Sequence, residues 1–455
     1  MKVKNKLAII PASLAMAAIL SITPALPFSS HAASIQAASP AVTMAAPPVP
    51  NAAAIMKKYG GTSITFVGDS VGGGHLRDLT LAARFQADTG IDVNIVEHPS
   101  SSTDSYSQLV RDFQAKSSAF DAMMIDVVWP GDFAPYLLNL TPYFSASYLK
   151  QYAPNVIAND TVGGHLVAIP WFGDFGLLYY RTDLLKKYGF SAPPKTWDEL
   201  TSMAQTIQAG ERKSNPSFYG FVFQGSAYEG LTCDALEWLA SSGTPNFIVN
   251  GKADLDNPNA IKMLNLAKSW VGTISPRGVT TYQEGDAQVA FTSGNAAFER
   301  NWPYAYSLNA AAGSKVAGKF GVAPLPAEPG SVPVATVGGW QVAISKYSKN
   351  PGAAVEWARY ITSPAVEKFD AITNTNVPTI PAVAVDPQVR ATNPYLDPAT
   401  ADALRVARPS GLFGINYQKA TTDIYQVINQ ILNGADPTSV LPGLDTKLNA
   451  LLPKM

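Results

Sequence analysis

The sequence has 455 residues, of which 47% are hydrophobic and 15% charged, so it encodes a folded protein rather than a disordered chain. Its 33 Lys and Arg residues nearly balance 34 Asp and Glu residues, a charge that does not favour binding to nucleic acid. The single cysteine excludes an intramolecular disulfide, and the four histidines never stand four residues apart, which excludes an HExxH zinc motif. The length exceeds what one hydrophobic core usually serves, so we expect two domains.

The first 38 residues are typical of an export signal. Lysines near the N-terminus precede an apolar run over 7–20, and small residues at Ser30-His31-Ala32 or at Gln36-Ala37-Ala38 offer a site for signal peptidase. This run is too short to span a membrane, for which about 20 residues are needed, and an uncleaved anchor is the alternative. Residues 39–54 are rich in alanine and proline and are expected to form a disordered tether, with the folded part beginning near Ala52. We therefore expect an extracytoplasmic protein, in the periplasm or at the cell surface.

Strand-forming and helix-forming segments alternate in the next part of the chain. Residues 63–67 predict a strand, 76–88 a helix and 91–96 a second strand, which together make a βαβ unit. A helix over 105–116 then leads to a strand over 121–127. The folded part therefore begins with an α/β sheet that contains parallel strands.

The rest of the chain interleaves helices and strands without one dividing linker. Further strands are predicted at 165–170, 177–180, 296–300, 319–323 and 340–345, and further helices at 197–208, 229–241, 258–271, 284–292, 351–361, 365–372, 399–407, 419–432 and 437–450. The first of these helices begins with the capping box Thr196-Trp-Asp-Glu199. Such an order suits two lobes that are each built from discontinuous pieces of chain.

Four of the eight tryptophans are flanked by proline or glycine, which places their rings at strand ends or in loops. They are Trp129, Trp171, Trp302 and Trp340. In open α/β sheets, ligands bind beyond the carboxyl ends of the strands, where an indole can lie flat under a ligand. The alternative for each ring is that it covers the edge of the core. The other four tryptophans fall inside helical patterns and are interpreted as core residues.

Two carboxylates stand close to these rings in the sequence. Asp126 ends a hydrophobic strand three residues before Trp129, and Asp174 follows Trp171 by three residues. A sugar needs such a pairing, because its C–H face stacks on an aromatic ring while its hydroxyls need acceptors and donors fixed in direction. The alternative is that each aspartate is a turn residue or a helix cap.

Other chemistries have less support in the sequence. Gly72-Gly73-Gly74 precedes a helix, but the GxxxxGK[ST] phosphate loop is missing, and no GxSxG motif indicates Ser/His/Asp catalysis. A glycoside hydrolase needs two carboxylates and sugar-stacking rings, so composition does not exclude it. Cys233 lies in a helical pattern and is interpreted as a buried structural thiol, and Arg300 is interpreted as part of a salt bridge.

Several motifs together resemble one protein family. They include Met124-Ile-Asp-Val-Val-Trp129, Ile169-Pro-Trp-Phe-Gly-Asp-Phe-Gly-Leu-Leu-Tyr-Tyr-Arg181, Asn301-Trp-Pro-Tyr-Ala-Tyr306, Gly338-Gly-Trp-Gln341 and Arg408-Pro409. In these motifs the chain resembles family 1 extracellular solute-binding proteins of ABC sugar importers, and among them the trehalose/maltose-binding proteins. The resemblance covers nearly all of residues 60–450.

The resemblance implies an α/β, two-lobe periplasmic-binding-protein fold of the type II kind, with discontinuous lobes joined by hinge strands. We place lobe one at 55–171 and 315–365, and lobe two at 172–314 and 366–455. The resemblance implies a protein without catalytic residues, cofactor or metal. Its implied partners are a carbohydrate ligand and the membrane permease of an ABC importer, and we expect a monomer. A glycoside hydrolase, or a solute-binding protein for a peptide, a polyamine or iron, are the alternatives.

The resemblance also implies roles for individual residues. The implied ligand-binding residues are Asp126, Asp174, Trp302, Tyr304, Trp340 and Arg408, with Trp171, Glu229 and Trp129 in second rank. The aspartates would accept sugar hydroxyls, the rings would stack on the sugar, and the arginine would donate a fork of hydrogen bonds. The family's acidic residue near 74–76 and its basic residue near 105–106 are missing. Because lost polar partners change which hydroxyls are satisfied, this puts the disaccharide specificity in doubt.

Overall fold

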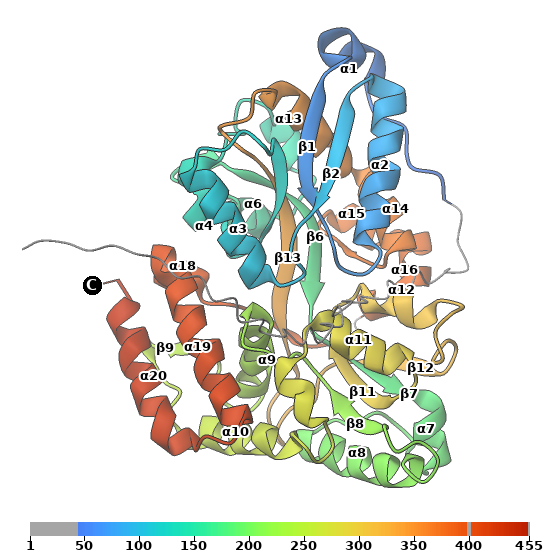
Figure 1. Ribbon diagram of the computed structural model, residues 1–455, viewed down its shortest axis with the longest axis vertical. Helices are drawn as coiled ribbons and strands as arrows, with labels where there is room; N and C mark the ends of the chain where they lie inside the picture. Colours follow the sequence, from blue (N-terminus) through green and yellow to red (C-terminus); the bar gives the residue numbers. More distant parts are fainter. Residues whose placement is uncertain (1–43, 398–401, 454–455) are drawn as a thin grey trace, which may run out of the picture. The chain divides into compact units, whose positions relative to one another are not determined.

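Two mixed β-sheets with surrounding helices make up the described part of the computed structural model, residues 44–397 and 402–453 (Figure 1). The export signal expected over 1–38 and the first residues of the tether lie outside these ranges. Within these ranges, every helix is too short or too polar to cross a membrane.

The first sheet has seven strands, ordered β14-β6-β13-β3-β1-β2, with β15 paired to β13. These strands are β1 (Ser63–Gly68), β2 (Asp92–Glu97), β3 (Ala122–Asp126), β6 (Ala168–Phe175), β13 (Val334–Ile344), β14 (Val377–Pro378) and β15 (Leu404–Ala407). β1 is parallel to both β2 and β3, whereas β13 is antiparallel to β3 and β6. The helices α2 (Gly74–Thr89) and α3 (Ser102–Gln114) connect β1, β2 and β3, as the predicted βαβ start requires.

The second sheet has four strands in the order β12-β7-β11-β8. They are β7 (Leu177–Arg181), β8 (Tyr219–Val222), β11 (Ala296–Asn301) and β12 (Phe320–Ala323). Only Gly176 separates β6 from β7, so the chain passes directly from the first sheet into the second. A Cβ atom at Gly176 would lie 1.9 Å from Glu237 Oε1, so a larger residue does not fit at this junction.

The other elements surround these sheets. The helices are α1 (Ala52–Tyr59), α4 (Pro130–Phe133), α5 (Ala146–Leu149), α6 (Pro154–Asn159), α7 (Thr182–Lys187), α8 (Trp197–Glu211), α9 (Glu229–Ala240), α10 (Pro258–Trp270), α11 (Glu284–Thr292), α12 (Ala305–Ala310), α13 (Pro351–Ile361), α14 (Pro364–Thr373), α15 (Pro381–Ala384), α16 (Pro387–Thr392), α18 (Ser410–Phe413), α19 (Tyr417–Leu432) and α20 (Pro437–Leu451). Two hairpins, β4 (Thr161–Val162) with β5 (His165–Leu166) and β9 (Ile248–Val249) with β10 (Lys252–Ala253), lie outside the main sheets.

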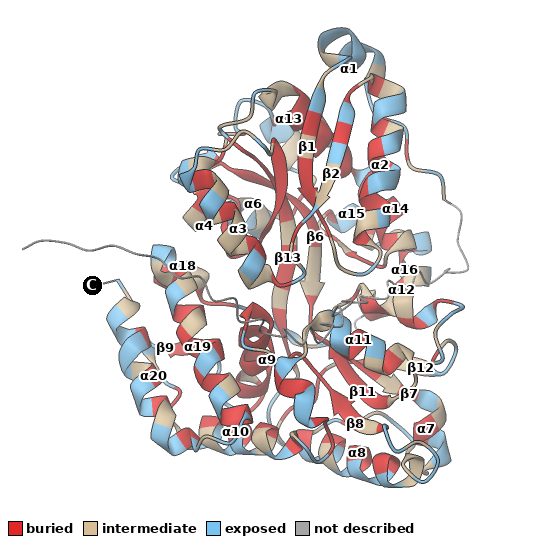
Figure 2. Cartoon of the chain, viewed as in Figure 1, coloured by how far each residue is buried: buried red, intermediate tan, exposed pale blue. Residues whose placement is uncertain are grey.

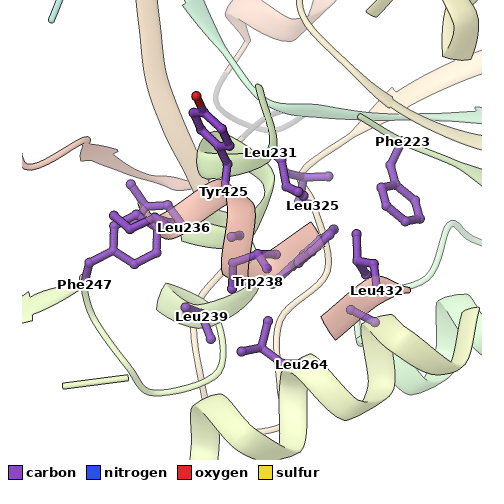
Figure 3. Close-up of a cluster of buried hydrophobic side chains, with 14 of the residues drawn as sticks. Phe223, Leu231, Leu236, Trp238, Leu239, Phe247, Leu264, Leu325, Tyr425 and Leu432 are labelled. Carbon is purple, nitrogen blue, oxygen red and sulfur yellow. The ribbon is translucent and has the colours of Figure 1, made fainter. Parts of the chain in front are cut away.

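Among the described residues, buried hydrophobic side chains form three clusters. One contains Phe66 of β1 and Val342 of β13, and a second contains Ala335 of β13 and Tyr179 of β7. The third packs α9 against α10 and α19 around Trp238 (Figure 3). The helix α9 is buried over 229–239 (Figure 2), so the charged residues that it carries are held inside the protein.

Part of the expected tether packs on the protein. Pro47 and Val49 are buried; Tyr360 Oη donates to the carbonyl of Pro47 at 2.8 Å, and Val49 N donates to Asp88 Oδ2 at 2.9 Å.

Some residues that the sequence prediction assigns to lobe two share a hydrophobic cluster with Phe66 of β1. They are Val366, Phe369, Ile380 and Val389. The lobe boundaries stay a prediction.

The prediction of a helix over 399–407 is wrong where the structure describes it. Leu404–Ala407 form β15, which pairs in parallel with Val334–Val337. A short segment of this kind takes its structure from the strand beside it rather than from local preference.

Candidate functional site

A cavity of about 80 Å³ lies beyond the carboxyl ends of β1 and β3. All six residues that the resemblance ranks first line this cavity. They are Asp126, Asp174, Trp302, Tyr304, Trp340 and Arg408, and the second-rank residue Glu229 joins them. Among residues 44–397 and 402–453, no group of three His, Cys, Asp or Glu side chains is arranged to hold a metal ion.

Arg408 pairs with two buried carboxylates in the cavity wall. Its Nη2 donates to Asp126 Oδ1 at 2.5 Å, and its Nη1 donates to Asp126 Oδ2 at 3.1 Å and to Glu229 Oε1 at 2.7 Å. All three residues are at most 5% exposed. The fork that the resemblance assigns to a sugar is thus directed at the protein, while Arg408 Nε is buried without a partner.

Glu229, at the start of α9, is held from a second side. It accepts hydrogen bonds from Tyr417 Oη at 2.5 Å and from Thr421 Oγ1 at 2.7 Å. Burial raises the pKa of Glu229 above its usual value, and Arg408 opposes this rise. With both oxygens of Glu229 bonded to the protein, this side chain holds Arg408 in place.

Asp174 is the carboxylate with an unused acceptor. It lies on β6 opposite Gly338 of β13, and its Oδ1 is buried without a hydrogen-bond partner. Burial raises the pKa of Asp174 well above its usual value; nearby Asp69 and Asp126 add to the rise, while Arg300 opposes it. A ligand donor that reaches Oδ1 therefore meets an acceptor with no competitor from the protein.

Trp302 and Tyr304 follow β11 and form the aromatic side of the cavity. Trp302 Nε1 donates to Glu284 Oε1 at 3.2 Å, and the guanidinium carbon of Arg300 lies 3.9 Å from the centroid of the indole. Tyr304 lies over Gly72, where a Cβ atom would come within 2.7 Å of the ring and where φ is +61°. The Oη atom of Tyr304 is buried without a partner, and burial raises its pKa well above 10.

Arg300 itself is buried behind Trp302. It forms ion pairs with Asp234 at 3.0 Å and with Glu237 at 2.7 Å, which confirms the salt bridge predicted for it. Both carboxylates lie on α9. The ring of Trp302 is thus fixed by a hydrogen bond at its edge and by a cation at one face.

Trp340 lies opposite a β-bulge in β6: it pairs with Phe172 whereas Gln341 pairs with Pro170, so Trp171 is the extra residue. Trp340 also stands opposite Asp126 of β3. Its indole packs against the imidazole of His98, with centroids 5.4 Å apart, and edge-to-face against Trp129 at 5.7 Å. The bulge and the two flanking rings determine how Trp340 faces the cavity.

The second-rank tryptophans do not line the cavity. Trp171 is 1% exposed and packs against Phe66 and the guanidinium of Arg77, which lies 4.1 Å from its ring. Trp129 is also 1% exposed and packs edge-to-face against Trp340. The structure therefore places these two rings in the core.

Some lining residues were not predicted from the sequence, among them Asp69, Glu284, Asn374 and Asn376. Asp69 follows β1 directly, so an acid at the carboxyl end of a strand, the signal that pointed to Asp126, was present for it too. Its carboxylate lies over Gly74, where a Cβ atom would come within 2.2 Å of Asp69 Oδ2. An acid thus does reach the wall near residues 74–76, where the resemblance found none.

Comparisons with known proteins identify the family and the fold of the chain. A family model described as bacterial extracellular solute-binding protein matches residues 76–368. A probable ABC transporter-binding protein of Deinococcus radiodurans is 45% identical over 81% of this chain and 89% of its own length. The maltodextrin-binding protein MdxE of Bacillus subtilis is 26% identical over 50% of this chain and 53% of its own length.

A solved structure gives the same result for the fold. Maltose-bound T. maritima MalE3 superposes with a TM-score of 0.81 at 36% identity, covering 86% of this chain and 100% of that chain. The expected α/β, two-lobe fold is thereby confirmed.

Proposed function

Since this chain belongs to the bacterial extracellular solute-binding proteins, which serve ABC transporters and are not enzymes, we propose that its ligand is a sugar. The sugar is a disaccharide such as trehalose or maltose, or a related oligosaccharide, that the protein binds after export by its N-terminal signal and delivers to a membrane permease. The observation that carries this proposal is the convergence of Trp302, Tyr304 and Trp340 with Asp126 and Asp174 on one cavity.

Each residue has a role that follows from its chemistry. The rings of Trp302, Tyr304 and Trp340 offer flat apolar faces for the C–H faces of a sugar. Asp174 Oδ1, which has no partner in the protein, accepts a hydrogen bond from the ligand. Asp126 and Arg408 hold each other, so the ligand meets them as a fixed pair.

The ligand enters only if the walls move apart. The cavity has a volume of about 80 Å³. Because one water molecule needs roughly 10–15 Å³ of cavity volume, the cavity has room for only a few waters. A disaccharide is larger than this and does not fit in the cavity as it stands. We propose that the sugar first binds one wall and that contacts with the opposite wall then stabilise the closed form, a shift of population between two states.

Thermal-shift and titration calorimetry experiments with the exported form of the chain test the proposal. A panel of mono-, di- and oligosaccharides should contain at least one that raises the melting temperature and binds with measurable heat, because a ligand specific for the native state stabilises it. Replacement of Trp340 by alanine should cost roughly 1–3 kcal/mol of affinity for that sugar. Tyr143→Ala, at an exposed tyrosine outside the cavity, is the control. A panel without heat or thermal shift would contradict the proposal.

A further inference from the structure

Acidic groups dominate the cavity that we propose for the sugar. Five lining residues carry a carboxylate and one carries a guanidinium. The carboxylates are Asp69, Asp126, Asp174, Glu229 and Glu284, and the guanidinium is that of Arg408. The positive charges behind the wall do not restore the balance, because each of them is already shared among several acids.

The sharing can be followed pair by pair. Arg408 serves both Asp126 and Glu229. Arg77 contacts Asp69 at 3.4 Å, but its other nitrogens pair with Asp78 at 2.9 Å and Asp370 at 3.2 Å. Arg300, whose guanidinium lies against Trp302, pairs with Asp234 and Glu237 of α9. Each of these three arginines thus faces at least two carboxylates.

Asp174 is left without a counterpart in this arrangement. Its Oδ1 has no hydrogen-bond partner, and Glu284, by contrast, accepts from Tyr228 Oη at 2.6 Å and from Trp302 Nε1. A buried carboxylate without a partner is unfavourable unless a proton or a cation compensates its charge. The ligand is one source of such a cation.

We propose that the cavity selects its sugar by charge: Asp174 receives an amino group of the ligand, and glycosides that carry a carboxylate or a phosphate are rejected. An ammonium group supplies a hydrogen bond and a compensating charge together, and charge-assisted hydrogen bonds are stronger than neutral ones. A hydroxyl supplies the hydrogen bond alone. An anionic group would add like charge to a wall that already has an excess of it. This inference rests on the proposed function, whose ligand class it narrows.

Matched analogues of one sugar test the inference. For the neutral sugar that gives the largest thermal shift, calorimetry at pH 7 compares the parent with its mono-amino-deoxy isomers, in which one hydroxyl at a time is replaced, and with its uronate and phosphate derivatives. At least one amino isomer should bind tenfold more tightly than the parent, and the anionic derivatives at least tenfold more weakly.

A variant ties the preference to Asp174. In Asp174→Asn the charge is lost at nearly constant shape, so the ratio between the affinities of the best amino isomer and of the parent should fall toward one. Asp92→Asn, at an exposed aspartate of β2 outside the cavity, should keep the ratio of the unmodified protein.

The possible results separate this inference from the proposed function. If neutral sugars bind and no amino isomer binds more tightly, or if an anionic derivative binds as well as the parent, the charge selection is wrong while the sugar-binding function stands. If the parent binds, an amino isomer binds more tightly and the anionic derivatives bind more weakly, both hold. If neither kind binds, both are wrong. A preference that persists unchanged in Asp174→Asn would also overturn the role of Asp174.

Discussion

The imidazole of His98 lies against the indole of Trp340, with centroids 5.4 Å apart and ring planes inclined by 32°. His98 is 3% exposed, and its Nε2 faces Asp69 Oδ1 at 3.7 Å. Because both Asp69 and Trp340 line the cavity, His98 connects two residues of the cavity wall.

We predict that His98→Ala weakens sugar binding, although His98 does not line the cavity. Loss of an aromatic neighbour is worth about 0.5–1.5 kcal/mol beyond burial, which corresponds to a roughly 2- to 12-fold weaker affinity, and His98→Phe should recover part of it. In a Trp340→Ala background the same His98→Ala change should have little further effect, because residues that act through one another are not additive. Calorimetry on the double-mutant cycle measures this, with exposed His165→Ala as control. Additive effects would argue against the connection.

A second prediction concerns the pair formed by Arg408 and Asp126. Arg408→Met should destabilise the protein by about 3–5 kcal/mol, because it leaves the buried carboxylates of Asp126 and Glu229 uncompensated. Adding Asp126→Asn to this variant should recover part of the loss. Urea unfolding measures both, and Arg390→Met, at an exposed arginine, should change the free energy of unfolding little. Equal stability of Arg408→Met and the unmodified protein would show that the pair contributes nothing.

The pH dependence of stability should carry the signature of Glu299. This residue is 0% exposed, and burial raises its pKa from 4.5 to about 8. Between pH 4.5 and about pH 8, Glu299 is protonated in the folded state but ionised in the unfolded state. The contribution of Glu299 to stability is therefore complete below pH 4.5 and is lost as the pH rises to about 8. The loss amounts to at most about 1.4 kcal/mol per pH unit.

Glu299→Gln should therefore flatten the fall in unfolding free energy between pH 5 and pH 8. The fall should not disappear, because burial also raises the pKa of Asp160 and of Glu367 to about 8. Urea unfolding at several pH values measures the slope, and Glu97→Gln, at an exposed glutamate, serves as control. A slope identical to that of the unmodified protein would contradict the prediction.

Cys233 offers a probe of the cavity. It is the one cysteine in the sequence, it is 2% exposed, and it belongs to the cavity wall. Burial also raises the pKa of its thiol well above 9, which lowers the fraction of reactive thiolate. We predict slow labelling by a maleimide, and slower labelling still in the presence of a bound sugar.

Mass spectrometry over time measures this labelling. The control is Ser202→Cys in a Cys233→Ala background, because Ser202 is exposed on α8 and should react at one rate with and without the sugar. Labelling of Cys233 that is as fast as that of the control would mean that the wall opens freely without a ligand.

Much of the fold could be predicted from the sequence because local pattern and final structure agree. The alternation over 63–67 and 91–96 is a property of the strands themselves, and β1 and β2 form where it predicts. β15 was missed because its four residues have a weak pattern of their own and take their structure from β13. That error matters for the site, because β15 leads directly to Arg408.

The site was predicted as a set of residues but not as a set of contacts. Proline, glycine and acids near aromatic rings singled out Trp302, Trp340, Asp126 and Asp174. The sequence does not reveal that Arg408 is directed at Asp126, because this pairing joins residues 282 positions apart. Glu284 was hidden for another reason: an acid in the first turn of a helix is common, since it interacts favourably with the helix dipole, and it draws no attention there.

The strand β13 passes from the cluster that holds Ala335 to the cluster that holds Val342. Between these anchors lie Gly338, Gly339 with φ +129°, and the irregular pairing at Trp340. We expect β13 to bend at this stretch when one cluster rotates against the other, because the register shift and the positive φ of Gly339 interrupt its regular pairing. Such a bend would change the direction of the Trp340 ring, so a sugar stacked on that ring would oppose the rotation.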